Sequence, residues 1–150
     1  MSEDQVLLRR FDEKGAWEQP TDYQGQVLAE DIKYLQQELL KSLGVNLKLE
    51  RHQDASFHSC LFADIDTKNS DIHLEIRFSK FGRLFTIRSL PGDVSLPFEI
   101  NLIVAISEKR GFRFVPFHCL KEPYDGVNPE LASVTGKTNP SWWDRYFDYI

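Results

Sequence analysis

The spacing of apolar residues changes once in the first half of the chain, and this change restricts the fold more than any other feature. Along residues 22–43 the apolar side chains recur every three or four positions, which places them on one side of a helix. Thr21 with Gln24 forms a capping pattern at the start, and Gly44 follows at the end. The sequence therefore predicts a long amphipathic helix whose buried stripe is Leu28, Ile32, Leu35, Leu39 and Leu43.

From Val45 onward apolar and polar residues alternate, which is typical of strands with one buried face. The alternating segments are residues 45–49, 57–65 (with Phe62 out of step) and 72–78, and residues 84–90 continue after a turn around Gly82. Turn-forming residues separate consecutive segments, so the strands are expected to pair as an antiparallel meander.

The second half of the chain adds helices and one further strand. Ser95 and Pro97 mark a helix start, and residues 97–110 form a helix or, because they are apolar nearly all round, a buried strand. Residues 112–117 are expected to form a strand and residues 121–140 a loop. Near the amino terminus, residues 6–8 could form a short strand. Residues 1–150 are thus predicted to be a single α+β domain with a sheet of four to five strands.

The last ten residues, 141–150, form an aromatic segment, whereas chain ends usually fray unless they are tied down. At helical spacing one face carries Trp142, Trp143, Tyr146, Phe147 and Ile150, and the other carries Asp144, Arg145 and Asp148. Rings of this size are costly to leave in water. We therefore expect a short terminal helix that closes the core with its aromatic face and presents its charged face to solvent.

Composition narrows the classes of function. The formal net charge is -5 and the pI is about 5.4, which argues against a nucleic-acid partner. The amino terminus lacks a secretory signal, and the longest apolar stretch, residues 100–106, is too short to span a membrane. The only two cysteines, Cys60 and Cys119, are too few for a disulfide scaffold. These features favour a cytoplasmic protein that does not bind membranes.

The most specific chemical hypothesis is a metal-dependent hydrolase. Asp64, Asp66 and Asp71 surround one predicted turn, and Glu75 and Arg77 follow in the next strand. This arrangement resembles restriction-endonuclease-like sites, in which such carboxylates hold a divalent metal, but Arg77 replaces their lysine. Acidic residues at a hairpin end are also commonly just solvated. We therefore keep the hydrolase as an alternative.

Other reactive constellations are weaker. His58, Cys60, His118 and Cys119 lack the paired spacing of structural zinc sites. The sequence contains no Gly-x-Ser-x-Gly elbow and no phosphate-binding glycine loop. The sequence thus predicts no catalytic residue, no metal ligand and no cofactor, and a protein that is not an enzyme.

Three carboxy-terminal segments resemble the ends of bacterial immunity proteins from contact-dependent and other polymorphic toxin systems. They are residues 111–116 (Gly-Phe-Arg-Phe-Val-Pro), 123–126 (Pro-Tyr-Asp-Gly) and 142–149 (Trp-Trp-Asp-Arg-Tyr-Phe-Asp-Tyr). The resemblance implies a compact cytoplasmic protein that binds a cognate toxin domain and blocks its active site. The negative charge agrees with this, because many such toxins are basic nucleases.

Protein binding is therefore the predicted function, with acidic side chains as the expected contacts. These are Asp64, Asp66, Asp71 and Glu75 on the meander and Asp144 and Asp148 at the chain end. A small-ligand-binding module with a pocket among the aromatic rings stays open beside the hydrolase. The sequence does not fix the oligomeric state.

Overall fold

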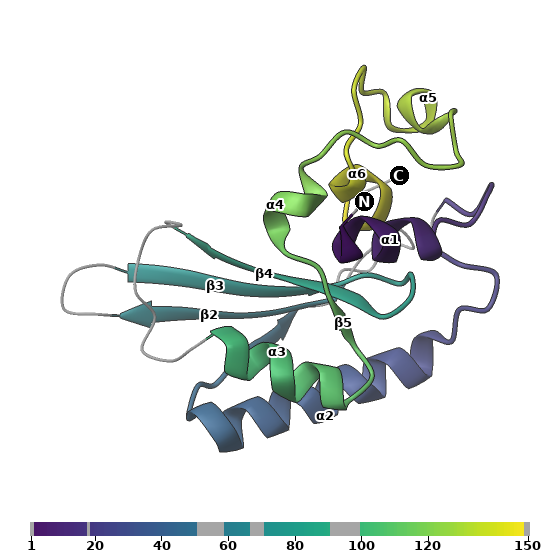
Figure 1. Cartoon of the computed structure of the whole chain (residues 1–150). Helices are drawn as coiled ribbons and strands as arrows, with labels where there is room; N and C mark the ends of the chain where they lie inside the picture. Colours follow the sequence, from purple (N-terminus) through teal and green to yellow (C-terminus); the bar gives the residue numbers. More distant parts are fainter. Residues whose placement is uncertain (1, 18, 51–58, 67–70, 91–99, 149–150) are drawn as a thin grey trace.

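A five-stranded sheet forms the centre of the molecule (Figure 1). The computed structural model describes residues 2–17, 19–50, 59–66, 71–90 and 100–148. The strands are β1 (Lys48–Glu50), β2 (Cys60–Asp66), β3 (Asp71–Phe78), β4 (Leu84–Leu90) and β5 (Arg113–Phe114). They are ordered β1-β2-β3-β4-β5; β1 to β4 pair with one another as antiparallel strands, and β5 pairs with β4 in parallel. The predicted α+β fold with an antiparallel meander is confirmed.

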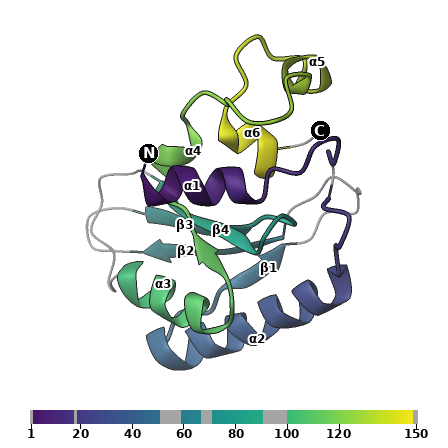
Figure 2. The same ribbon diagram turned by 45° about the vertical axis from the view of Figure 1, so that its right-hand side comes forward.

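In the described part of the chain, six helices pack around the sheet. They are α1 (Glu3–Arg10), α2 (Gly25–Leu43), α3 (Ile100–Lys109), α4 (Phe117–Leu120), α5 (Leu131–Thr135) and α6 (Trp142–Tyr146). Helices α2 and α3 lie against one face of the sheet (Figures 1 and 2). On the opposite face α1, α4 and α6 gather over one end, and α5 lies farther out. None of the described helices is long and apolar enough to cross a membrane.

The main core lies between the sheet and α2 with α3. The stripe of α2 is buried at Leu28, Ile32, Leu35 and Leu39, and Leu43 packs against the cluster as a partly buried residue. From the sheet, β3 contributes Leu74, Ile76 and Phe78, the alternate residues of its sequence. The spacing of α2 and the alternation of β3 were therefore predicted correctly, because a local repeat determines which side chains share one face.

A second core lies on the other face, between the sheet and α1, α4 and α6. It contains Leu8 from α1 and the rings of Trp142, Tyr146 and Phe147 from α6, with Trp143 partly buried against it. The Tyr146 hydroxyl donates a hydrogen bond to the Leu8 carbonyl. The prediction that the aromatic carboxy terminus closes the core is confirmed for residues 142–147. Ile150 lies outside the described residues.

Several boundaries differ from the prediction. Residues 6–8 belong to helix α1, not to a strand, because Ser2 and Gln5 form a reciprocal capping box that starts a helix. Helix α2 begins at Gly25 without a side-chain cap, and the Thr21 N–H bonds Glu13 instead of starting the helix. Of the two alternatives for residues 97–110, the helix is formed, as α3 over residues 100–109. The loop predicted for residues 121–140 contains α5.

The last predicted strand, residues 112–117, is shortened to two residues and pairs in parallel. Helix α3 lies between β4 and β5 in the chain, and a helix that connects two neighbouring strands allows them to run in the same direction. Pro116 then caps α4, which starts at Phe117.

Candidate functional site

The register of β2 and β3 places four predicted contact residues on one face of the sheet. Asp66 lies opposite Asp71, Asp64 opposite His73, and Phe62 opposite Glu75. Residues directly opposite each other in an antiparallel pair point to the same side, and so do residues two positions apart. We call the resulting set the acidic strip: Asp64, Asp66, Asp71 and Glu75.

The acidic strip shares its sheet face with the second core but lies beyond the edge of that core. At the covered end of β3, the Ser79 hydroxyl donates to the Tyr146 carbonyl at 2.9 Å. Next along the strands, the guanidinium groups of Arg77 and Arg88 lie 5.3 and 5.1 Å from the centre of a Trp143 ring. Farther out, the side chain of Asp64 is 77% exposed. Figure 1 shows this end of β2 and β3 projecting away from α1, α4 and α6.

Glu75 differs from the other members of the acidic strip because its charge is neutralised within the sheet. Arg88 donates to one Glu75 oxygen from Nε at 3.0 Å and from Nη2 at 2.6 Å, and Arg77 Nε lies 3.7 Å from the same oxygen. Burial opposes ionisation of Glu75, but the hydrogen bond and charge of Arg88 and the charge of Arg77 lower its pKa overall. With a side chain only 13% exposed, Glu75 is not the exposed acid that we expected.

Three carboxylates, those of Asp64, Asp66 and Asp71, lie at the outer end of the acidic strip. Asp64 is paired with His73, whose Nδ1 lies 2.9 Å from the carboxylate. Asp66 and Asp71 face each other across the two strands. A hydrogen bond between their carboxyl groups, and the nearby charges of Asp66 and Asp64, raise the pKa of Asp71. Among the described residues no lysine or arginine pairs with Asp66 or Asp71.

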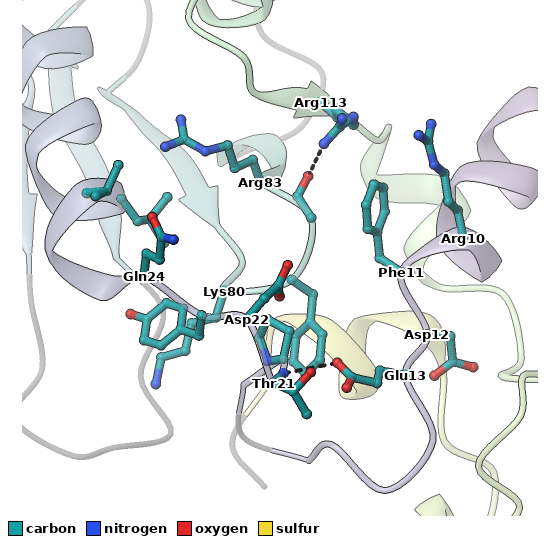
Figure 3. Close-up of a pocket in the computed structure, with 16 residues that line it drawn as sticks. Arg10, Phe11, Asp12, Glu13, Thr21, Asp22, Gln24, Lys80, Arg83 and Arg113 are labelled. Carbon is teal, nitrogen blue, oxygen red and sulfur yellow. Dashed lines mark hydrogen bonds between the residues drawn. The ribbon is translucent and has the colours of Figure 1, made fainter.

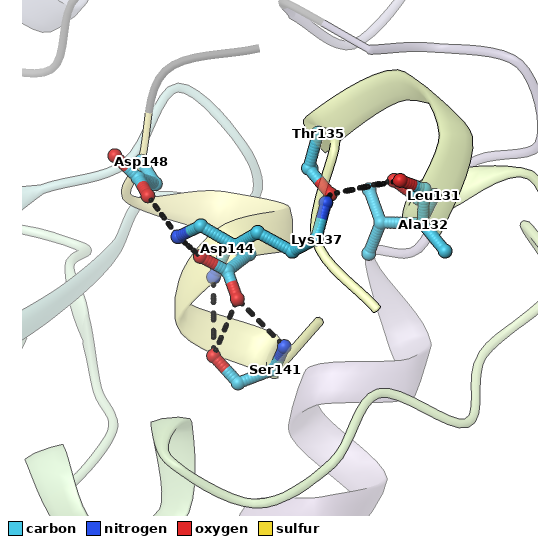
Figure 4. Close-up of polar contacts among 7 residues, drawn as sticks. All are labelled: Leu131, Ala132, Thr135, Lys137, Ser141, Asp144 and Asp148. Carbon is cyan, nitrogen blue, oxygen red and sulfur yellow. Dashed lines mark hydrogen bonds and ion pairs between the residues drawn. The ribbon is translucent and has the colours of Figure 1, made fainter. Parts of the chain in front are cut away.

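Asp144 and Asp148 form a separate cluster around Lys137 (Figure 4). The Lys137 ammonium pairs with Asp144 and lies 2.8 Å from an Asp148 oxygen. Asp144 also accepts hydrogen bonds from the Ser141 N–H at 2.8 Å and the Ser141 hydroxyl at 3.0 Å. Burial opposes its ionisation, but the hydrogen bonds from Lys137 and Ser141 lower its pKa overall.

The prediction that Asp144 and Arg145 face solvent is wrong. Both are buried, Asp144 at 5% and Arg145 at 1% exposure. Helical spacing separates the charged from the aromatic residues, but it does not show that other segments cover the charged side too. Here Lys137 and Asp12, both outside the terminal segment, cover it. Asp144 is therefore shielded from solvent, and Asp148 is paired with Lys137.

The described residues do not form the metal site of the hydrolase hypothesis. They contain no group of three or more His, Cys, Asp or Glu side chains able to hold a metal ion. Of the three carboxylates in that hypothesis, Glu75 is bound to Arg88, whereas Asp64 and Asp66 are exposed. Removing Arg88 from Glu75 would cost a charge-assisted hydrogen bond before any metal could bind.

The described cysteine and histidine residues do not form a metal site either. Both cysteines, Cys60 and Cys119, are buried, and neither forms a disulfide bond. Burial, followed by the charge of Glu75, raises the pKa of Cys60 to about 12, and burial and Asp4 raise the pKa of Cys119. Neither is a ready thiolate ligand or nucleophile. His118 lies on α4, and His58 lies outside the described residues.

Sequence reasoning did not include His73, Arg88 and Trp143 among the contact residues, and it named Arg77 in the hydrolase hypothesis. His73, Arg77 and Arg88 belong to its face, and the Phe62 ring lies 6.0 Å from the His73 ring, centre to centre. Alternation within β3 groups His73 and Arg77 with Glu75, so this part was readable from the sequence. The contribution of Arg88 and Trp143 depends on strand register and on where α6 docks.

No protein-family model, curated protein or solved structure matches this chain. The immunity-protein resemblance of residues 111–149 therefore stays a prediction. A function for the acidic strip has to be argued from its own geometry and charge.

Proposed function

We propose that this chain is an immunity protein, which binds and neutralises a cognate toxin domain through the outer end of the acidic strip. The observation that carries the proposal is the pair Asp66 and Asp71, which face each other at an exposed strand end without a cationic partner among the described residues. Adjacent like charges oppose folding. A basic surface of a partner would neutralise them.

The position of these carboxylates suits rapid recognition. A local concentration of one sign of charge steers a complementary surface and accelerates encounter. The carboxylates stand on paired strands, so little conformational freedom has to be lost when the partner docks. The strip can therefore act as a preformed surface.

Aromatic and arginine side chains lie beside the carboxylates of the acidic strip. Phe62, His73 and Trp143 are partly buried aromatic or heteroaromatic rings beside the strip, and Arg77 and Arg88 stack on Trp143. Aromatic and arginine side chains are enriched at the energetic centres of protein interfaces. We propose that the acids guide the toxin domain and that this ring-and-arginine zone forms the closer contact.

The test uses the carboxy-terminal domain of the protein encoded immediately upstream as the binding partner. Association and dissociation rates are measured by surface plasmon resonance at several salt concentrations. Replacing Asp64, Asp66 and Asp71 by Asn should slow association about tenfold at low salt and leave a smaller effect at high salt. Dissociation should change less, because exposed charges mainly affect encounter.

The matched control removes the same number of carboxylates elsewhere. Glu30, Glu108 and Glu130 are exposed and lie on α2, on α3 and beside α5. Their replacement by Gln should leave the association rate near that of the unmodified protein. Equal slowing by both triple variants would reduce the effect to net charge and remove the acidic strip from the interface. Absence of binding to the upstream domain would contradict the immunity function itself.

A further inference from the structure

A pocket of about 750 Å³ lies on a different part of the molecule from the acidic strip (Figure 3). Its walls come from the end of α1, the segment between α1 and α2, the first turn of α2, the turn between β3 and β4, and β5. This volume is within the range of small-molecule sites. Apolar surface comes from Phe11, Tyr23 and Val27, among others.

Two arginines from distant parts of the sequence converge on this pocket. The guanidinium carbons of Arg10 and Arg113 lie 5.3 and 4.9 Å from the centre of the same Phe11 ring. The Arg113 side chain donates a hydrogen bond from Nη1 to the Gly82 carbonyl at 2.8 Å. No carboxylate among the described residues pairs with either arginine. Most of their N–H groups are therefore available, and the two positive charges repel each other unless an anion lies near them.

The fold holds the Phe11 ring, which lies near both arginines, in place. A Cβ atom on Gly82 would overlap the Phe11 side chain, so the ring lies directly on the Gly82 backbone. Gly82 and Arg83 have φ values of +59° and +55°, and the Leu84 N–H closes their turn onto the Phe81 carbonyl at 3.1 Å. Arg83 is the one non-glycine residue with positive φ in the described part of the chain. Such strain is more frequent at functional sites than elsewhere.

Charged side chains line several walls of the pocket, and Asp22 and Lys80 are among them. Figure 3 shows Arg10, Arg83 and Arg113 along one side and Asp12 and Glu13 along the other. Asp12 is bound by Arg145, and the Glu13 carboxylate accepts the Thr21 N–H at 3.1 Å. Arg83 is paired with Asp31. Of the three arginines that line the pocket, Arg10 and Arg113 are thus the two without a carboxylate partner among the described residues.

We propose that this pocket binds a small phosphorylated molecule, with its phosphate between Arg10 and Arg113 and its body against the apolar wall. Arginine presents a planar fork of donors that matches a phosphate group in bidentate fashion. Both guanidinium groups lie beside the same Phe11 ring. The proposal is independent of the immunity function, because none of the residues of the acidic strip lines the pocket.

Isothermal titration calorimetry at low salt tests the site with two probes, inorganic pyrophosphate and adenosine monophosphate. We expect at least one to bind, and Arg10→Gln to weaken that binding at least about tenfold, as expected for loss of one charge-assisted contact. Arg113→Gln should weaken it by at least as much. Because Arg113 also contacts the Gly82 backbone, its thermal unfolding is measured in parallel, whereas Arg10 is exposed and tests the site without that complication.

Lys41→Gln is the control, because it removes one exposed positive charge near the far end of α2. Its binding should equal that of the unmodified protein. Tighter binding of adenosine monophosphate than of pyrophosphate would support contact of the ligand body with the apolar wall, and equal binding would support a site for the phosphate alone. No binding of either probe at about 10 mM, or binding that Arg10→Gln leaves unchanged, would overturn the proposal.

Discussion

Asp71 is a surface carboxylate whose charge works against the fold. The hydrogen bond with Asp66 and the charges of Asp66 and Asp64 raise its pKa above 3.8. A raised pKa means that the folded state favours the neutral carboxyl. This contribution is fully present below pH 3.8 and is lost as the pH rises through the higher pKa of the folded state. Near neutral pH the charge of Asp71 therefore destabilises the protein.

We expect Asp71→Asn to raise the urea midpoint of unfolding at pH 7 and to have little effect near about pH 3, where the carboxyl is protonated in either state. Asn keeps the size of the side chain and removes the charge. Glu130→Gln, which removes an exposed carboxylate elsewhere, should leave the midpoint unchanged at both pH values. A lower midpoint for Asp71→Asn at pH 7 would mean that the charge supports the fold, and would weaken the case for a cluster maintained for binding.

The turn between β3 and β4 packs against Phe11, the residue at the end of α1. Its backbone requires positive φ at Gly82, and the Phe11 ring occupies the space that a Gly82 side chain would need. Gly136, the cap of α5, has a similar φ of +72° but no atom within 4 Å of its Cβ position. The two glycines share the same conformational requirement and differ only in packing.

This pair allows packing to be separated from backbone strain. Gly136→Ala should lower the free energy of unfolding by about 1 kcal/mol, from left-handed strain alone. Gly82→Ala should lower it by about 3 kcal/mol, because displacement of Phe11 adds an overpacking cost. Chemical denaturation followed by circular dichroism measures both values. Equal losses would show that Phe11 moves aside at no cost, and that the aromatic wall of the pocket is not fixed by the turn.

A buried ion pair links a residue near the amino terminus of the chain with one near the carboxy terminus. Arg145 on α6 donates from Nε to Asp12, 133 positions earlier in the chain, at 2.8 Å, and both side chains are at most 1% exposed. Asp12 also accepts from the Tyr124 hydroxyl, the Val127 N–H and the Asn128 side chain. Burial and the hydrogen bond to Asp12 raise the pKa of Tyr124 to about 12. Residues after α1, in the loop after α4 and in α6 thus share one polar network.

Arg145→Met should lower the free energy of unfolding by about 3 kcal/mol, because it leaves the Asp12 charge buried without a cation. Adding Asp12→Asn to this variant should restore part of the loss, since the remaining side chain is then neutral. Urea unfolding of the two single variants and the double variant measures the coupling. If the two single losses simply add in the double variant, the ion pair does not tie the ends of the chain together in the way described.

Local periodicity determined those parts of this protein that depend on neighbours in sequence. The stripe of α2, the alternation of β3 and the aromatic side of α6 follow from spacing alone, because side chains at a fixed repeat share one face wherever the element packs. The same logic indicated that Asp64, Asp66, Asp71 and Glu75 belong to the meander.

Only the tertiary structure decided which of these charged side chains reach solvent. Strand register brought Asp66 opposite Asp71 and Arg88 onto Glu75, leaving charge at one end and neutralising it at the other. Asp144 and Arg145 were buried by Lys137 and Asp12, neither of which belongs to their helix. A helical or strand period contains no information on such partners, because burial of a charge depends on the distant segment that covers and pairs it.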